Sequence, residues 1–241
     1  MERKHVDFSL IIPAYNEAGR ICSTLEHVQD YLEIQSYSSE IIVVDDGSLD
    51  NTAQVVEENF PRVQVIRYEP NRGKGCAVRT GMLAAVGDYR VFYDADASTP
   101  IDELERLWPK FKDGADVVIG SRSLPDSVIE VPQPWYRAKM GRIFSLMVQC
   151  CGLWGIPDSQ CGFKGFTRRA VQVVFPRQTI DHFSFDVELL FIARKHKLRI
   201  EQVPVRWINC PLTRVNALTD ASRMFWELLL IRYRHIAGRY A

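Results

Sequence analysis

The sequence has no excess of charge of either sign. Lysine and arginine together number 30, aspartate and glutamate also number 30, and the formal net charge at pH 7 is zero. Proteins that attract nucleic acid through their overall field carry a clear positive surplus. We therefore expect no nucleic-acid partner, and any recognition of phosphate has to come from charges placed locally.

Cysteine pairs, zinc-binding spacings and long apolar runs are also missing. The six cysteines form no Cys-x-x-Cys pair and have no histidine at a zinc-ligand spacing, which is typical of reduced thiols in a cytosolic protein. No secretory leader opens the sequence. The longest nearly apolar run, residues 143–156, is shorter than the ~20 residues that span a bilayer. We expect a cytoplasmic protein without a transmembrane span.

Several common catalytic and nucleotide-binding signatures are absent as well. There is no Gly-x-Ser-x-Gly elbow and no Ser-His-Asp order of a hydrolase. The run Gly73-Lys74-Gly75 has Val78 where a dinucleotide fingerprint needs glycine, and it lacks the Walker spacing. Two interpretations of this run stay open: a plain strand–helix turn, or a tight loop whose main chain and Lys74 approach a phosphate.

What the sequence does contain is a regular alternation of short apolar runs and helical patterns. Strands are predicted over residues 8–13, 40–45, 63–67, 89–94 and 116–120, with helices between them. The second half predicts a polar loop over 124–134, helices over 136–151, 185–193 and 219–237, and an edge strand over 200–207. This rhythm indicates βαβ units, so we predict a single α/β domain with a mainly parallel sheet flanked by helices.

Charged or polar side chains follow nearly every predicted strand of the first half. Ligands bind beyond the carboxyl ends of the strands in sheets of this class, so these side chains mark a candidate site. They are Tyr15, Glu17, Asp45, Asp46, Arg72, Lys74, Asp94, Asp96, Ser121 and Arg122.

Asp94 and Asp96 form the most specific pair among them. Side chains two residues apart in an extended chain point to the same side, so the two carboxylates could converge on one point. Two carboxylates at such a short distance repel each other unless a cation lies between them. Mg²⁺ or Mn²⁺, which also holds substrate phosphates, would supply that charge. Spacing alone leaves a solvated turn as the alternative, and the polar groups at the other strand ends favour the metal site.

Arginines and the last helix point to anionic and lipid partners. Arg122, Arg137 and Arg214 could together clamp a second anionic group beside a bound metal. The helix over 219–237 combines apolar bulk and a tryptophan with several arginines, which suits a membrane interface. A helix packed on the core with a basic outer face explains the same pattern.

Seven motifs occur in a fixed order along the chain. They are Pro13-Ala-Tyr-Asn-Glu17, Val44-Asp-Asp-Gly-Ser48, Asn71-Arg-Gly-Lys-Gly75, Asp94-Ala-Asp96, Gly120-Ser-Arg122, Asp158-Ser-Gln-Cys-Gly-Phe-Lys164 and Phe185-Asp-Val-Glu188. This series resembles the inverting GT-A glycosyltransferases that act on polyprenyl phosphates. The dolichyl-phosphate glucosyltransferase type is most similar, with the mannosyltransferases as cousins.

The resemblance implies a GT-A (Rossmann-like) fold and a role for each site residue. The base and ribose of the nucleotide sugar would contact Pro13, Tyr15, Glu17, Val43 and Asp45. Asp46 and Lys74 would belong to the same donor site. Asp94, Ala95 and Asp96 would hold the diphosphate through the metal, and Arg122, Arg137 and Arg214 would bind the diphosphate and the acceptor phosphate. Asp158, near the sugar, and Arg122 would be the catalytic residues.

The sequence departs from the family pattern at three places. Ser98 stands where relatives carry a metal-contacting glutamine, Gly141 replaces a serine that helps to bind the acceptor phosphate, and Leu212-Thr213-Arg214 replaces Gly-Ser-Lys. The hydrophobic anchors of some relatives are not found. We expect residues 8–122 to form a nucleotide-sugar half, 123–218 an acceptor half and 219–241 an amphipathic helix on a membrane surface.

The expected reaction is transfer of a hexose from a nucleotide sugar to a polyprenyl phosphate. UDP-glucose is the favoured donor, and GDP-mannose is the alternative. A transferase that builds a polysaccharide and a nucleotide-sugar-binding protein without catalysis are the competing interpretations.

Overall fold

A computed structural model describes residues 5–131, 135–210 and 219–241, without the side chains of 135–138 and 219–222. Seven strands form one central sheet: β1 Phe8–Ala14, β2 Ser39–Asp45, β3 Gln64–Arg67, β4 Tyr89–Tyr93, β5 Val117–Ser121, β7 Phe163–Thr167 and β8 Ile200–Pro204. Two short strands, β6 Val128–Val131 and β9 Arg206–Ile208, pair separately.

The helices are α1 Ile21–Glu33, α2 Thr52–Asn59, α3 Lys74–Ala84, α4 Leu107–Lys112, α5 Trp135–Cys150, α6 Arg168–Val174, α7 Phe185–Lys195 and α8 Thr219–Ile236. Two 3₁₀ helices, η1 Ile101–Arg106 and η2 Phe175–Arg177, precede α4 and follow α6. The structure therefore confirms the predicted mixed α/β architecture with helices around a central sheet.

The strand order is β3-β2-β1-β4-β7-β5-β8, and β7 is the strand that breaks the parallel pattern. It runs antiparallel to both β4 and β5, while β1, β2, β3 and β4 are parallel neighbours. Because β7 reverses direction between them, β4 and β5 point the same way. Strand β8 is parallel to β5, so the carboxyl ends of six strands and the beginning of β7 meet at one edge of the sheet.

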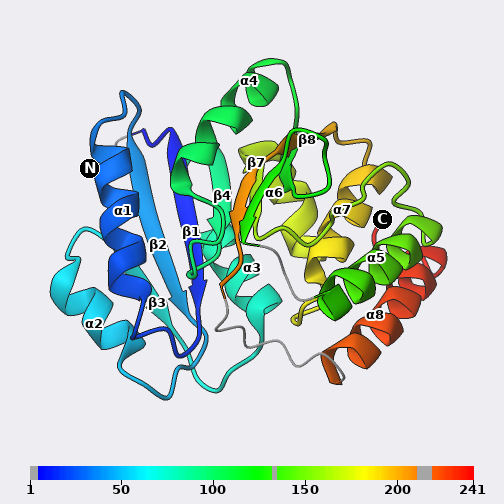
Figure 1. The fold of residues 1–241 in the computed structure, drawn as a ribbon, viewed down its shortest axis with the longest axis horizontal. Coiled ribbons are helices and arrows are strands. Elements are labelled where there is room, and N and C mark those ends of the chain that lie inside the picture. Colours follow the sequence, from blue (N-terminus) through cyan, green and yellow to red (C-terminus); the bar gives the residue numbers. More distant parts are fainter. Residues whose placement is uncertain (1–4, 132–134, 211–218) are drawn as a thin grey trace.

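Helices cover both faces of the sheet, which explains why the strands are so apolar (Figure 1). All seven residues of β1 are buried. One core cluster joins Leu10 and Val43 to α1, and the other joins Ile11 and Val44 to α3, α6 and α7. Alternate residues of each strand therefore enter opposite cores, as the two-residue period of a strand requires.

The second half of the chain departs from the sequence-based expectation. Strand β7 begins within the segment 158–166 and ends just after it, in a region for which no strand is predicted. Strand β6 lies within the predicted polar loop. The predicted edge strand over 200–207 divides into β8, which is the sheet edge, and β9, which pairs with β6. These pairings join segments far apart in sequence, so local periodicity does not reveal them.

The last helix α8 lies beside α5, as Figure 1 shows, and buries one side against the core. Val148 of α5 and Leu228 and Ile231 of α8 belong to the same apolar cluster. Within the described part of the chain, no helix combines the length and the apolar character that crossing a bilayer requires.

Candidate active site

Asp94 lies at the end of β4, where β7 begins beside it. Tyr93 pairs with Phe163 across these two strands, so Gly162 comes directly beneath the Asp94 side chain. A Cβ atom built on Gly162 would lie 1.9 Å from Asp94 Oδ2, which means that the carboxylate rests on the glycine main chain. Gly162 is a site residue that sequence reasoning missed, because the strand it introduces was not recognised.

Lys74 is the charge partner of Asp94. Its Nζ lies 2.5 Å from Asp94 Oδ1. Burial alone would lower the pKa of Lys74, but the carboxylates of Asp94, Asp186 and Asp96 outweigh burial and raise this pKa. Lys74 is therefore a cation in the structure, as the donor-site prediction requires.

Asp96 follows in a tight turn. Ala97 has a positive φ of 50°, and Asp96 Oδ1 accepts the main-chain N–H of Ser98 at 3.0 Å. The turn and the strand end together form a small pocket, which is lined by Tyr93, Asp94, Ser98, Thr99, Gly162 and Trp207.

The donor set at this turn fits Mg²⁺ or Mn²⁺. Both cations prefer oxygen ligands, and they commonly bind one or two carboxylates and complete their shell with phosphate oxygens and water. Among the described side chains, no three histidine, cysteine or carboxylate groups gather closely enough to hold a metal. Asp94 and Asp96 would therefore bind a metal that also holds a ligand's diphosphate.

Arg122 and Asp158 form a second charged pair at the same edge. Arg122 Nε and Nη2 donate to the two Asp158 oxygens at 2.8 Å each, and the Arg122 main-chain N–H donates to Oδ2 at 2.7 Å. The guanidinium also lies 5.4 Å from the ring centroid of Trp207, the residue that lines the Asp94 pocket. The two charged pairs thus belong to one site.

The Arg122 contacts hold Asp158 in its ionised form. Burial alone would raise the pKa of the Asp158 carboxyl, but the charge and hydrogen bonds of Arg122 lower it from 3.8 to about 2. A carboxylate this weakly basic is poorly suited to remove a proton near neutral pH. The geometry instead suits a group that orients a neighbour.

A third pair lies beneath the site and was missed from the sequence. Lys164 of β7 is fully buried, and its Nζ donates to Asp186 Oδ1 at 2.6 Å. Lys164 also lies 5.2 Å from the ring centroid of Phe92. A lysine between glycine and phenylalanine residues, followed downstream by an acid opening a helix, was the signal that could have indicated a buried pair.

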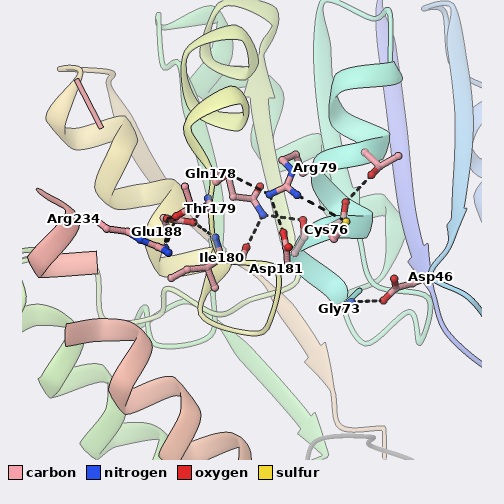
Figure 2. Close-up of polar contacts among 12 residues, drawn as sticks. Asp46, Gly73, Cys76, Arg79, Gln178, Thr179, Ile180, Asp181, Glu188 and Arg234 are labelled. Atoms are coloured by element: carbon pink, nitrogen blue, oxygen red, sulfur yellow. Dashed lines mark hydrogen bonds and ion pairs between the residues drawn. The ribbon is translucent and has the colours of Figure 1, made fainter. Parts of the chain in front are cut away.

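The glycine-rich run before α3 is held from two sides (Figure 2). On one side Asp46 accepts the main-chain N–H groups of Arg72 at 2.8 Å and Gly73 at 2.9 Å. On the other side Asp181 O accepts the N–H of Gly75 at 2.7 Å. The main-chain N–H groups of Arg72, Gly73 and Gly75 are thus engaged within the protein, which leaves the side chain of Lys74 as the main group of this run that could approach a phosphate.

The comparisons with known proteins agree with this geometry. The sequence pattern described as glycosyl transferase family 2 matches residues 9–175. The chain belongs to this family.

Named members of the family are similar over most of the chain. A dolichyl-phosphate beta-glucosyltransferase of Trichomonas vaginalis is 37% identical over 83% of this chain and 63% of its own length. Those of Saccharomyces cerevisiae and Homo sapiens are 32% and 31% identical over 98% and 96% of this chain, and over 77% and 76% of their own lengths.

Solved structures confirm the GT-A fold of this family 2 glycosyltransferase. Glucosyl-3-phosphoglycerate synthase from Mycobacterium tuberculosis, in complex with Mn²⁺, UDP and phosphoglyceric acid, superposes with a TM-score of 0.72 at 18% identity. The match covers 98% of this chain and 79% of that one. The same enzyme with Mn²⁺ and UDP-glucose has a TM-score of 0.69 at 19% identity, covering 94% and 79%.

The other residues expected to contact the nucleotide lie in or next to the loops after β1 and β2. Glu17 N–H donates to Thr52 Oγ1 at 2.8 Å, and Glu17 is nearly buried. Asp45 is buried, and its Oδ2 accepts no hydrogen bond from the described residues, although Arg67 Nε lies 3.6 Å away. Tyr15 is half-buried beside them.

Three residues of this expected set are buried in the strands or the turn. Pro13 of β1 is buried, Ala95 is 5% exposed, and Val43 is fully buried in the core cluster beside α1. The side chain of Val43 has no accessible surface in the structure, and its contact with the nucleotide stays a prediction. Asp46 is buried as well, and its contacts assign it to holding the 71–73 loop.

The expected acceptor-phosphate arginines are only partly placed. Arg122 is described above. Arg137 falls in α5, but its side chain lies outside the described residues, as does the whole of Arg214.

Replacing Asp158 by asparagine should change how stability depends on pH. The pKa of Asp158 is lower in the folded protein than in the unfolded chain, where it is 3.8. The ionised carboxylate therefore stabilises the fold at pH values above 3.8, and this stabilisation is lost as the pH falls through about 2. The shift corresponds to about 2 kcal/mol. Urea unfolding at a series of acidic pH values should therefore show that wild type has a higher free energy of unfolding than Asp158→Asn, and that this difference becomes smaller toward low pH. The exposed Asp113→Asn serves as control, and parallel curves for wild type and Asp158→Asn would contradict the expectation.

Gly73→Ala should destabilise the fold more than the same change at Gly19. Gly73 has φ +103°, and an added Cβ would lie 2.4 Å from Asp181 O, whereas nothing lies within 4 Å of a Cβ at Gly19. Forcing a residue into such a conformation costs about 1–3 kcal/mol, before the steric overlap is counted. Thermal and urea unfolding of the two variants measure the difference, and equal stability would show that the loop relaxes freely.

Proposed function

We propose that this glycosyltransferase transfers glucose from UDP-glucose to a dolichyl or related polyprenyl phosphate with inversion at the anomeric carbon. The observation that carries the proposal is the meeting of two carboxylates, Asp94 and Asp96, with the Arg122–Asp158 pair at one edge of the sheet. The acceptor follows the names of the similar dolichyl-phosphate beta-glucosyltransferases. The donor follows the UDP and UDP-glucose complexes of the structural neighbours.

Asp94 and Asp96 would hold a divalent metal together with the donor diphosphate, as the Mn²⁺ in those neighbours suggests. The metal would supply positive charge that stabilises the departing diphosphate. The buried Asp45 Oδ2 is suited to accept a hydrogen bond from a ribose hydroxyl, because it accepts none from the described residues. Lys74 and Arg122 would add positive charge at the diphosphate.

The chemistry needs positioning more than a strong base. A phosphate monoester is largely ionised near neutral pH, since its second pKa is about 6. One acceptor oxygen therefore attacks the anomeric carbon while the bond from that carbon to the diphosphate oxygen breaks on the opposite face. Asp158, whose ionised form Arg122 stabilises, would orient the sugar or the acceptor, and Arg122 would help to align the phosphate.

An exposed apolar strip on α8 supports a lipid acceptor at a membrane surface. Its members are Phe225, Trp226, Leu229, Leu230, Tyr233 and Ile236, which are 37–76% exposed. At 3.6 residues per turn these positions occupy one arc of the helix, and the exposed Arg223 and Arg232 fall at its two borders. Apolar and aromatic side chains flanked by arginine are typical of helices that lie in a bilayer interface.

A panel of labelled nucleotide sugars, offered with polyprenyl phosphate, Mg²⁺ or Mn²⁺, tests the reaction. UDP-glucose should give the lipid-linked product, and Asp96→Asn should lower transfer at least about a hundredfold, because one metal ligand loses its charge. Circular dichroism should show an intact fold in that variant. If only GDP-mannose supports transfer, the donor is GDP-mannose and not UDP-glucose. Tight UDP binding without any transfer would favour a binding protein without catalysis.

Vesicle co-sedimentation tests the α8 strip. Leu229→Glu should weaken binding to anionic lipid vesicles by about tenfold or more, because burying a leucine in lipid contributes about 1.5–3 kcal/mol. Leu49→Glu, at a position 88% exposed in the loop after β2, makes the same change away from the strip and should leave vesicle binding unaltered. Equal loss in both variants, or in neither, would count against a membrane-binding role of α8.

A further inference from the structure

We propose that Lys74 competes with the divalent metal for Asp94, so that the metal enters the site together with the nucleotide rather than ahead of it. This inference rests on the metal site of the proposed function and adds a role for a residue of the chain itself. It makes Lys74 an internal counterion that occupies the donor site until the substrate arrives.

The first support is the placement of the Asp94 carboxylate. Its Oδ1 is buried and accepts no hydrogen bond from the described residues, and the Lys74 ammonium 2.5 Å away is its charge partner. Its Oδ2 rests against the main chain of Gly162. The Asp94 side chain keeps 30% of its surface exposed, so a cation that coordinates it from this open side comes close to the Lys74 ammonium or displaces it. Two cations so close repel each other strongly.

The second support is that the main chain around Lys74 is fixed while its side chain is long. Asp46 holds the N–H groups of Arg72 and Gly73, and the carbonyl of Asp181 holds that of Gly75. Figure 2 shows Gly73 bonded to Asp46 and, on the opposite side of the loop, Asp181 close to the start of α3. Lys74 can therefore leave Asp94 by rotating its four-carbon side chain, without any movement of α3.

The third support concerns where the displaced charge can go. Asp186 also contributes to the favourable field at Lys74, but this acid already neutralises the buried Lys164. A metal ion alone would leave Lys74 without a full partner. A nucleotide diphosphate brings new negative charge to the same edge of the sheet, and Lys74 can then pair with it. Metal and nucleotide should consequently strengthen each other's binding.

Binding of Mn²⁺ to the intact protein, followed by the electron paramagnetic resonance signal of the free ion, tests this coupling without any turnover. Wild type should bind Mn²⁺ weakly alone and much more tightly with UDP. Lys74→Met should bind Mn²⁺ alone at least about tenfold more tightly than wild type, because a neighbouring like charge is removed. The gain that UDP adds should shrink in the same variant.

Two further variants make the result specific. Lys74→Arg keeps a positive charge and should retain weak binding of Mn²⁺ alone. Lys112→Met removes one lysine charge from the exposed end of α4, close to the amino end of β5, and should match wild type. Circular dichroism of each variant establishes that the fold is intact.

The possible failures are distinguishable. If wild type binds Mn²⁺ with UDP but Lys74→Met binds Mn²⁺ alone no better than wild type, the competition is refuted and the metal site stands. If wild type binds no Mn²⁺ even with UDP, the metal site and the competition both fall.

Discussion

The antiparallel pairing of β7 with β4 is the constraint on which the site depends. It brings the segment before β7 to the same edge as the end of β4, so that Gly162 supports Asp94 and Asp158 reaches Arg122. The same register places Lys164 opposite Phe92, on the side of the sheet where Asp186 lies. A slip of one residue would exchange the two faces of β7 and move the lysine away from its acid.

Pairing of opposite charges at three places is the second organising feature. Asp94 with Lys74, Asp158 with Arg122, and Asp186 with Lys164 form three pairs around the beginning of β7. Removing one member of a buried pair leaves a charge that water cannot reach, which is strongly unfavourable. Each of these three acids is therefore kept at the edge of the sheet by a cation beside it.

The first half of the fold was predictable because its information is local. Each βαβ unit combines an apolar strand, a turn and an amphipathic helix within a few dozen residues, and the polar strand ends followed from the parallel order. Strand β7 could not be predicted in this way, because its partners β4 and β5 are chosen by the tertiary fold and a buried lysine interrupts its apolar pattern. That Asp46 holds the loop of residues 71–73 was not predicted either, for a similar reason. A carboxylate at a strand end looks the same in sequence whether it faces a ligand or holds a neighbouring loop.

The segment after α8 and the loop before α3 share one polar framework. Glu188 of α7 is fully buried and accepts the N–H groups of Thr179 and Ile180 at 2.9 and 2.8 Å, and also the hydroxyl of Tyr240 at 2.7 Å. The neighbouring Gln178 donates from Nε2 to the carbonyl oxygen of Gly75 at 2.8 Å, in the first turn of α3. The end of the chain that follows α8 is thereby tied, through a single short segment, to the loop that carries Lys74. If the proposed lipid acceptor lies along α8 and the proposed donor lies at Lys74, this framework would fix the distance between them, and an in-line displacement between two large substrates depends on that distance.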